Sequence, residues 1–246
     1  MRAMILAAGL GTRLRPLTND RPKALVEIEG RTLLEIALAR LRRFGVTEVI
    51  INVHHFADKV VAYLEAHDNF GMRIEISREE ELLDTGGGLK KAAPFFLEGG
   101  SDEPFLVHNV DVLSSIDLAR MVQFHRQQQA LATLAVQHRN TSRSLLFDDE
   151  GHLCGRHSRG SEVELVRACA QHQPLAFCGI HVISPSIFSI LSEDGIFPIV
   201  PAYLRLASQG ERITAFESDE YYWRDLGRPE NLEQAARDVR QNLSWQ

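Results

Sequence analysis

The chain carries, close to residue 1, an apolar run that leads directly into a glycine-containing loop crowded with positive charge. Residues Met4–Ala8 are all apolar and predict a strand that is buried on both faces. Gly9 and Gly11 follow this strand, and the same loop then carries four cations, Arg13, Arg15, Arg21 and Lys23. Because glycines leave the backbone N–H groups bare and the cations follow closely, the segment suits a polyphosphate ligand.

Two well-known phosphate-binding loops do not fit this segment. The dinucleotide-binding pattern GxGxxG would need a third glycine where Leu14 stands, and no P-loop string GxxxxGK[ST] follows the strand. The segment instead contains the string GxGTRxxPxTxxxPK, from Gly9 to Lys23. We therefore expect a phosphate-binding loop of a different kind.

The composition is that of an ordinary globular protein with an acidic balance. The 246 residues are 44% hydrophobic and 24% charged, which is enough for one large α/β domain or two small ones. No stretch approaches the roughly 20 apolar residues of a membrane span, and the net charge of −6 disfavours broad nucleic-acid binding. The odd number and wide spacing of the cysteines argue against a disulfide framework or a zinc site and favour a cytoplasmic location: Cys154, Cys169 and Cys178.

The first half of the chain alternates strands with helices. The pattern predicts, in order, a strand at 2–7, helix at 32–44, strand at 48–53, helix at 57–66, strand at 72–77, short helix after Gly86–Gly88, strand at 104–109 and helix at 117–129. Such alternation is typical of a parallel, doubly wound sheet, whose ligands bind at the carboxyl ends of the strands. We therefore expect an α/β, Rossmann-like fold with a mostly parallel sheet.

The pattern changes after Leu131. Strands are expected near 130–136, 142–149, 176–183 and 211–216, and helices near 185–191, 199–208 and 229–241. The segment 152–173 is polar and is expected to be irregular, and the run Glu79–Glu81 is expected to be solvated. With no repeat and no long linker, the sequence indicates a single domain.

Five motifs occur in the order and spacing of a known family. They are the Gly9–Lys23 loop, the cluster DTGGG at 84–88, an aspartate after an apolar strand (VHNVDV, Asp111), a glycine within a strand (FCGIHV, Gly179) and an aspartate near a glycine (WRDLG, Asp225 and Gly227). Each motif is weak alone, since an aspartate after a strand is often only a helix cap. Together they make nearly the whole chain resemble the sugar-1-phosphate nucleotidyltransferases.

The resemblance implies a Mg²⁺-dependent enzyme. In this family the phosphate of a sugar 1-phosphate attacks the α-phosphorus of a nucleoside triphosphate, giving a nucleotide sugar and pyrophosphate. Such catalysis depends on positioning and on electrostatic stabilisation, so no side-chain nucleophile is expected. By resemblance, Asp111 and Asp225 hold Mg²⁺, Arg13 grips the β- and γ-phosphates, and Lys23 lies between the α-phosphate and the sugar phosphate.

The resemblance also implies which residues bind the substrates. Nucleotide binding is expected at Ala7, Ala8, Gly9, Gly11, Thr12, Gly86 and Gly87, and acceptor binding at Asn109, Glu162 and Gly179. One domain, 1–246, is expected, with a nucleotide-binding half at 1–130 and a sugar-phosphate-binding half at 131–246. Val110 and Arg228 stand where many members have glycine and threonine, and the residues around Glu162 diverge from the usual glutamate–lysine pair.

The sequence leaves several reaction products, and one non-catalytic role, as alternatives. The likeness is nearest to small single-domain members that make UDP-N-acetylmuramate or GDP-mannose. A cytidylyltransferase for choline phosphate would use the same first loop, and its acceptor pocket would present aromatic faces or carboxylates to a quaternary cation. A non-catalytic nucleotide-sugar sensor is the alternative from another class. Such sensors often lose the loop arginine or a metal aspartate, whereas Arg13, Lys23, Asp111 and Asp225 are all present here.

Overall fold

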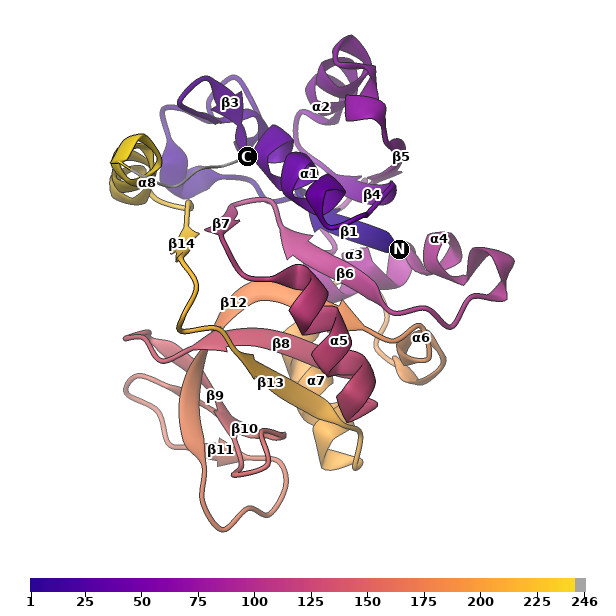
Figure 1. Ribbon diagram of the computed structural model, residues 1–246, viewed down its shortest axis with the longest axis vertical. Coiled ribbons are helices and arrows are strands. Elements are labelled where there is room, and N and C mark those ends of the chain that lie inside the picture. Colours follow the sequence, from indigo (N-terminus) through magenta and orange to yellow (C-terminus); the bar gives the residue numbers. More distant parts are fainter. Residues whose placement is uncertain (242–246) are drawn as a thin grey trace. The chain divides into compact units, whose positions relative to one another are not determined.

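The structure, a computed structural model, describes residues 1–241 of the 246-residue chain. The backbone separates into two compact units, whose elements are labelled in Figure 1. Unit 1 comprises Met1–Leu82, His108–Ser115 and the chain from Tyr222 onward, and unit 2 comprises Leu83–Val107 and Ile116–Tyr221. The strand β6 (Phe105–Asn109) runs from unit 2 into unit 1.

A parallel sheet lies in the middle of unit 1. Its strands, in the order in which they pair, are β1 (Arg2–Leu6), β4 (Glu48–Val53) and β5 (Arg73–Arg78). Ile5 lies opposite Ile51, which lies opposite Ile76. The apolar runs of β1 and β4 are buried, as expected for parallel strands that are covered on both faces.

Two short antiparallel pairs also belong to unit 1. They join β2 (Glu27–Ile28) to β3 (Arg31–Thr32), and β7 (Val112–Ser114) to β14 (Trp223–Asp225). In the second pair, Asp225 lies opposite Val112. Segments from the middle and the end of the chain thus lie side by side, as Figure 1 shows. Short 3-10 turns are found in the loops, at Thr12–Leu14, Lys23–Leu25 and Asp68–Gly71.

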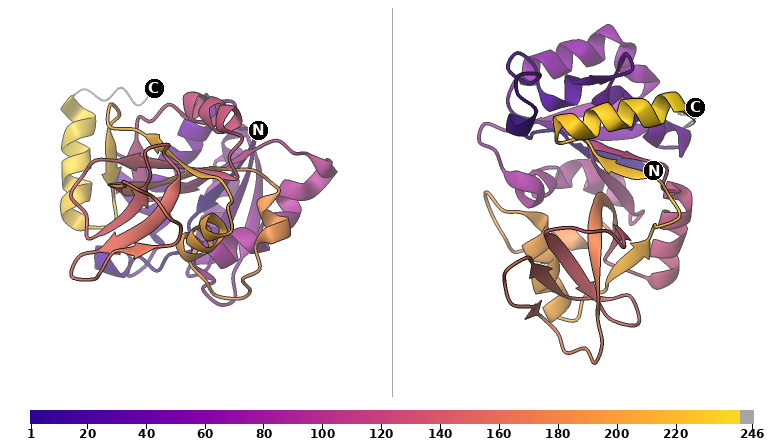
Figure 2. Two further views of the ribbon diagram at one scale, coloured as in Figure 1. Left: turned by 90° about the horizontal axis from the view of Figure 1, so that it is seen from below. Right: turned by 90° about the vertical axis from the view of Figure 1, so that its left-hand side faces the viewer.

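The helices of unit 1 are α1 (Leu33–Arg43), α2 (Ala57–Ala66) and α8 (Pro229–Gln241). α1 begins after Thr32, whose hydroxyl accepts a hydrogen bond of 3.0 Å from the N–H of Glu35. Its apolar side is buried through Leu33, Leu34, Ala37, Leu38 and Leu41. α8 contacts β2 and β14, and its course is clearest in the two views of Figure 2.

Unit 2 is built around the long strand β12 (Gln173–Ile183). Its first residues pair with β9 (Arg143–Phe147), and the rest of the strand pairs with β8 (Ala132–Gln137). From β9 the antiparallel pairing continues to β10 (Leu153–Ser158) and β11 (Glu164–Leu165). On its other side, β8 pairs in parallel with β13 (Ile213–Glu217).

The helices of unit 2 are α3 (Asp84–Lys91), α4 (Ala93–Leu97), the 3-10 turn Glu98–Gly100, α5 (Leu118–Gln128), α6 (Ile187–Ile190) and α7 (Ile199–Ser208). α5 begins after Asp117, whose carboxylate accepts from the N–H of Arg120 at 2.9 Å. α7 buries Ile199, Ala202, Tyr203, Leu204, Leu206 and Ala207.

Three expectations about this fold are wrong. The glycine cluster lies inside α3 rather than before it. The polar segment 152–173 contains β10 and β11, because an edge hairpin needs backbone pairing and not a continuous apolar face. Glu79, expected to be solvated, is only 5% exposed, and its buried carboxylate accepts a hydrogen bond from Asn52. No helix among residues 1–241 combines the length and the hydropathy that crossing a membrane requires.

A buried histidine in unit 2 makes stability depend on pH. The ring of His125 contacts the hydroxyls of Thr133 (2.9 Å) and Ser184 (3.0 Å). Because the Ser184 hydroxyl donates to the carbonyl of Ala130, it accepts a hydrogen bond from Nε2–H of His125. Burial lowers the pKa of His125 to about 4, from 6.5.

We expect unfolding to become easier as the pH falls from 6.5 towards 4. In that window the unfolded chain binds a proton at His125 that the folded chain does not, so stability is fully present above pH 6.5 and is lost below it. The loss approaches about 1.4 kcal/mol per pH unit for one histidine. Urea unfolding at several pH values should show a shallower dependence in His125→Gln than in the control His172→Gln, whose histidine is exposed. Equal slopes would contradict this assignment.

Candidate active site

The loop after β1 folds back on itself at Gly11. This residue has a φ of +64°, which favours glycine, and it precedes the turn Thr12–Leu14. Its carbonyl accepts a hydrogen bond of 2.8 Å from the hydroxyl of Thr18, and a Cβ at Gly11 would lie 3.0 Å from the methyl group of Thr18. The turn leaves Thr12 and Arg13 exposed, with Leu14 buried beneath them.

A buried polar chain holds the start of this loop. The N–H of Ala7 donates to Oδ1 of Asn52 at 2.8 Å, and Nδ2 of Asn52 donates to Glu79 at 2.7 Å. Asn52 is 3% exposed and lies near the end of β4, beside β1. The N–H of Ala7 is therefore engaged within the protein and does not donate to a ligand. Ala8 is buried behind it and Gly9 is exposed.

Lys23 is the buried cation of the loop. It is 9% exposed, and its ammonium forms an ion pair with Oδ2 of Asp111. Asp111 follows β6 and stands just before β7, so that the ion pair joins the first loop to the strand ends of unit 1. A buried lysine without a partner would be costly, and Asp111 supplies that partner.

The pairing of β14 with β7 brings Asp225 to the same place. Beyond the last paired residues, the N–H of Leu226 donates to the carbonyl of Asp111 at 2.8 Å. The side chain of Asn231 then donates to the carbonyl of Asp225 at 2.7 Å. The two aspartates therefore lie on adjoining backbone segments although they are far apart in the sequence.

Three charged groups converge on Gly227, and the fourth, Asp111, is bonded to one of them, Lys23. A Cβ on Gly227 would lie 2.7 Å from Oδ1 of Asp225, 2.9 Å from the guanidinium of Arg13 and 3.3 Å from the ammonium of Lys23. The N–H of Gly227 also donates to Oδ1 of Asp225. A larger residue would therefore displace these groups, which gives a steric reason for glycine after the aspartate.

The strand that leads to Asp111 is held by a neutral histidine. His108 is buried in β6, and its Nδ1 donates to the carbonyl of Asn109 at 2.8 Å. Burial, and next the charge of Arg40, lower the pKa of His108 to about 4. Val110 is buried, and its N–H donates to the carbonyl of Leu6 at 3.1 Å, so the departure from glycine there is accommodated by packing.

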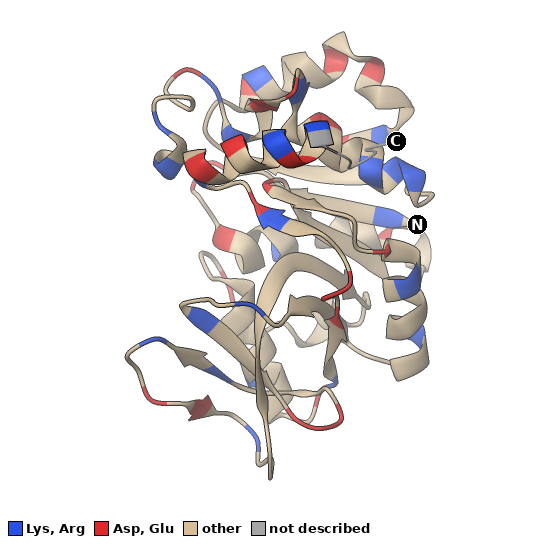
Figure 3. Cartoon of the chain, turned by 60° about the vertical axis from the view of Figure 1, so that its left-hand side comes forward, with Lys and Arg blue, Asp and Glu red and all other residues tan. Residues whose placement is uncertain are grey.

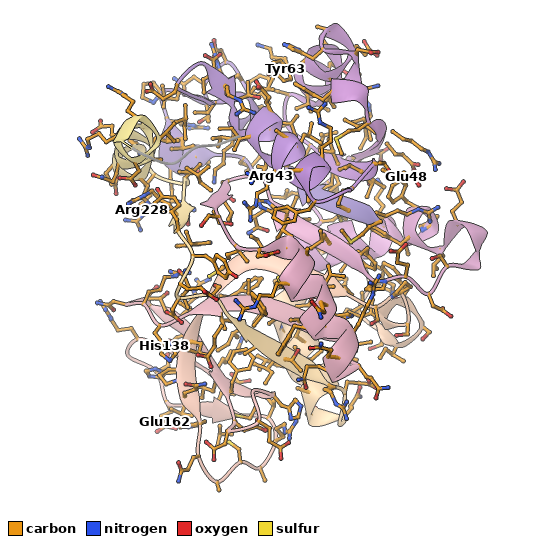
Figure 4. The ribbon with its side chains drawn as sticks, viewed as in Figure 1. Arg43, Glu48, Tyr63, His138, Glu162 and Arg228 are labelled. Carbon is orange, nitrogen blue, oxygen red and sulfur yellow. The ribbon has the colours of Figure 1, made fainter. Side chains whose placement is uncertain are left out.

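Arg228 extends into solvent. Its side chain is mostly exposed and lies 3.8 Å from the carboxylate of Glu230. In Figure 4 it lies between β14 and α8. Figure 3 shows acidic residues in the first part of α8 and residues of both signs farther along it.

Four predicted site residues, Gly86, Gly87, Glu162 and Gly179, belong to unit 2, whereas Asn109 belongs to unit 1. Within unit 2, the N–H groups of Gly86 and Gly87 donate to the carbonyl of Phe197 at 2.9 and 3.1 Å. A Cβ on Gly86 would lie 2.3 Å from the ring of Phe197, and one on Gly87 would lie 2.3 Å from the carbonyl oxygen of Gly195. Close packing of the 195–199 segment is thus a sufficient reason for both glycines, and contact with a base stays a prediction.

Gly179 and Glu162 also lie in unit 2, on different elements. Gly179 has a φ of +72° and occupies an irregularity in the pairing of β12 with β8, which favours glycine. Glu162 is exposed in the loop between β10 and β11 and lines a groove of about 640 Å³. Figure 4 shows Glu162 and His138 on the same side of unit 2 in that view.

A second cluster of potential metal ligands lies at the end of β8. The ring of His138 lies 3.0 Å from the carboxylate of Asp219, and Glu217 is close by. All three residues are exposed, and Asp219 raises the pKa of His138 by hydrogen bonding. A surface ion pair explains this arrangement.

Comparison with known proteins identifies the class of this chain. A family model described as nucleotidyl transferase matches residues 2–144, and the chain belongs to this family. The chain is 36% identical over 237 residues to N-acetylmuramate alpha-1-phosphate uridylyltransferase from Caulobacter vibrioides, covering 93% of this chain and 92% of that protein. It is 29% identical over 257 residues to a UTP–glucose-1-phosphate uridylyltransferase from Synechocystis sp., covering 97% of this chain and 63% of that protein. The expected resemblance is thereby confirmed.

Solved structures support the fold. A putative glucose-1-phosphate thymidylyltransferase from Bacillus anthracis matches with a TM-score of 0.80 at 19% identity, covering 98% of this chain and 96% of that one. HddC from Yersinia pseudotuberculosis matches with a TM-score of 0.76 at 23% identity, covering 97% and 99%. The predicted Rossmann-like α/β class is confirmed. The expected halves at 1–130 and 131–246 stay a prediction.

Sequence reasoning missed the residues that support the site from behind. Asn52 and Glu79 carry no motif of their own, and Thr18 is part of the Gly9–Lys23 string but was given no role. The available signal was the polar residue Asn52, which interrupts the apolar run 49–53 near the carboxyl end of β4, where ligand-binding groups concentrate in parallel sheets.

Replacing Gly227 by alanine should impair catalysis more than folding. The added Cβ would press on Asp225, Arg13 and Lys23, and displacement of such groups by about 1 Å can cost roughly 100-fold in rate. Pyrophosphate release measured at saturating nucleotide should show this loss, while the thermal midpoint changes by only a few degrees. If Gly227→Ala kept the kcat of the wild type, the close contact of Gly227 with Asp225, Arg13 and Lys23 would not matter for catalysis, which would contradict this assignment.

Replacing Asn52 by alanine should lower stability. The change leaves the buried N–H of Ala7 without its acceptor, which costs about 1–3 kcal/mol. The exposed Asn140→Ala is the control and should stay within about 0.5 kcal/mol of wild type in urea unfolding. Equal stabilities of the two variants would show that Asn52 does not hold the loop.

Proposed function

We propose that this nucleotidyltransferase transfers the uridylyl group of UTP to N-acetylmuramate 1-phosphate and releases pyrophosphate. The observation that carries the reaction type is the convergence of Arg13, Lys23 and Asp225 on Gly227, with Asp111 bonded to Lys23. Support for these particular substrates comes from the Caulobacter relative, which is similar along 92% of its length and bears this activity in its name.

The two cations, Arg13 and Lys23, suit a reaction in which two anions must approach each other. An anionic acceptor approaches an anionic α-phosphate, and negative charge then builds on the departing pyrophosphate. The exposed guanidinium of Arg13 can make two parallel hydrogen bonds to phosphate oxygens. Lys23 is largely buried, so its ammonium is held in place as a compact point charge near the bond that forms.

Asp111 and Asp225 fit a divalent cation, for which we propose Mg²⁺. The family generally uses divalent metal ions, and carboxylate oxygens are ligands that Mg²⁺ prefers. One oxygen of Asp111 is bonded to Lys23 and one of Asp225 to the N–H of Gly227. Among residues 1–241, the other oxygen of each carboxylate has no hydrogen-bond partner. When bound, Mg²⁺ would withdraw charge from phosphate oxygens.

The remaining predicted residues fit supporting roles. The backbone N–H groups from Ala8 to Thr12 would contact the triphosphate, whereas the carbonyl of Ala7 would accept a hydrogen bond from a donor on the nucleoside. Gly86 and Gly87 are proposed to lie near the base. Asn109, Glu162 and Gly179 are proposed to contact the acceptor sugar.

A substrate screen tests this proposal. Purified protein is incubated with UTP, GTP, CTP or dTTP and a panel of sugar 1-phosphates with Mg²⁺, and pyrophosphate release is followed. We expect the highest kcat/KM with UTP and N-acetylmuramate 1-phosphate, and loss of activity with a chelator. A preference for GTP with mannose 1-phosphate, or for CTP with choline phosphate, would replace the proposed substrates. If no pair of substrates releases pyrophosphate, the alternative of a non-catalytic nucleotide-sugar sensor would be favoured.

Removing the charge of Asp111 should nearly abolish turnover without unfolding the protein. Asp111→Asn loses both a metal ligand and the partner of Lys23, and loss of one such electrostatic group costs about 10²–10³ in kcat. The exposed Asp149→Asn is the matched control and should keep full activity. Normal turnover by Asp111→Asn would show that the assignment of the metal site is wrong.

A further inference from the structure

The strand that carries Asp225 has little support from its own sheet. β14 has three residues, and in the described part of the chain it pairs with β7 alone. Two hydrogen bonds of 2.9 Å join Tyr222 to Ser115 at one end of this pair, and the bond from Leu226 to Asp111 closes the other end. Because a two-stranded ribbon is marginally stable in water, β14 needs support from another element.

The last helix, α8, supplies this support through one carboxylate. Oδ2 of Asp238 accepts a hydrogen bond of 2.7 Å from the hydroxyl of Tyr222 and lies 3.0 Å from the guanidinium of Arg224. Nε of Arg224 in turn donates to the hydroxyl of Tyr222 at 2.9 Å, so the three side chains form a closed triangle. Oδ1 of Asp238 accepts from Gln234, one turn earlier in the helix, at 2.7 Å. Both oxygens of Asp238 are therefore held.

This triangle is largely shielded from water. The side chains of Asp238 and Arg224 are 18% and 28% exposed. The hydrogen bond from Tyr222, and next the one from Gln234, hold the pKa of Asp238 below its ordinary value, so that Asp238 is a carboxylate at neutral pH. A charged pair with these additional hydrogen bonds keeps its geometry better than an exposed surface pair does.

The triangle involves the residue next to Asp225 but the opposite face of the strand. Successive side chains of a strand point to opposite faces, so the bonds of Arg224 to α8 leave the carboxylate of Asp225 on the face of Lys23 and Arg13. α8 also reaches the backbone of Asp225, whose carbonyl accepts from Asn231 at 2.7 Å. The helix therefore holds the backbone of the site at two neighbouring points.

We propose that Asp238 is a positioning residue, which fixes Asp225 for the divalent cation by holding β14 against α8. The inference rests on the proposed function, in which Asp225 is a ligand of that cation. A carboxylate whose backbone is already fixed loses less conformational freedom when it binds a metal. Groups that orient a metal ligand contribute roughly 10- to 100-fold to metal affinity or activity. Asp238 acts through the backbone, so the lower end of this range applies to it.

Substitution of Asp238 by asparagine tests this role. Asp238→Asn keeps the size of the side chain and removes the charge that faces Arg224. The protein is titrated with Mn²⁺ alone, and unbound Mn²⁺ is measured by electron paramagnetic resonance. The site is defined as the binding that Asp225→Asn abolishes. We expect the Kd of this site to rise about tenfold in Asp238→Asn.

The Mg²⁺ dependence of catalysis gives a second measurement. Pyrophosphate release by Asp238→Asn should need about tenfold more Mg²⁺ for its half-maximal rate, and kcat should recover at high Mg²⁺. A merely structural role would lower the thermal midpoint and the active fraction at every Mg²⁺ concentration, without shifting the Mg²⁺ requirement. Asp238→Glu keeps the charge and should recover part of the Mn²⁺ affinity.

A control on the same helix separates positioning from general docking of α8. Arg240→Gln breaks the ion pair of 3.0 Å between α8 and Glu29, which does not involve β14. It should leave the Mn²⁺ affinity and the Mg²⁺ requirement as in wild type. If Asp238→Asn does not fold, Tyr222→Phe removes one hydroxyl of the triangle and should shift both quantities in the same direction.

The possible failures are distinguishable. An active protein in which neither Asp238→Asn nor Tyr222→Phe shifts the Mn²⁺ affinity would overturn the role of Asp238 and leave the proposed function standing. An equal shift in Arg240→Gln would also overturn it, since docking of α8 as a whole would then be the cause. Wild-type Mn²⁺ binding that Asp225→Asn does not change would overturn the metal assignment together with this role. No pyrophosphate from wild type with any pair of substrates would refute the proposed function itself.

Discussion

The candidate active site depends on the pairing of β14 with β7. The hydrogen bond from the N–H of Leu226 to the carbonyl of Asp111 continues this pairing past its last residue. It is the contact that brings a residue near the end of the chain to the carboxyl end of β6. Without it, Asp225 and Gly227 would not meet Lys23 and Arg13, and the loop after β1 would be a phosphate-binding loop without an acidic counterpart.

The balance of charges in the site determines which ligands it can bind. Arg13, Lys23 and Asp225 gather around Gly227, and Asp111 is paired with Lys23, so two cations and two carboxylates leave the site close to neutral before any ligand arrives. A divalent cation would offset the carboxylates and leave Arg13 and Lys23 to face a polyphosphate. The buried chain from Ala7 through Asn52 to Glu79 holds the loop from behind. Rigid support of this kind is what electrostatic catalysis requires.

Much of this could be predicted from the sequence, because the motifs are local and the strands are strongly apolar. The glycine loop, the aspartates and the order of elements in the first half all follow from such patterns. What escaped prediction depends on long-range contacts. The burial of Glu79 requires β5 beside β4, the glycines of α3 pack against residues 195–199, and the bonds of Asp238 require α8 beside β14. A polar sequence such as that of β10 contains too little periodicity to reveal its pairing with β9.

The most direct test of the account is to locate the metal. Crystals grown with Mn²⁺ and a non-hydrolysable UTP analogue would be measured at the manganese absorption edge. The account predicts an anomalous peak within ligand distance of both Asp111 and Asp225, with Lys23 and Arg13 on the phosphates. A peak at His138, Glu217 and Asp219 with none at the two aspartates would contradict it.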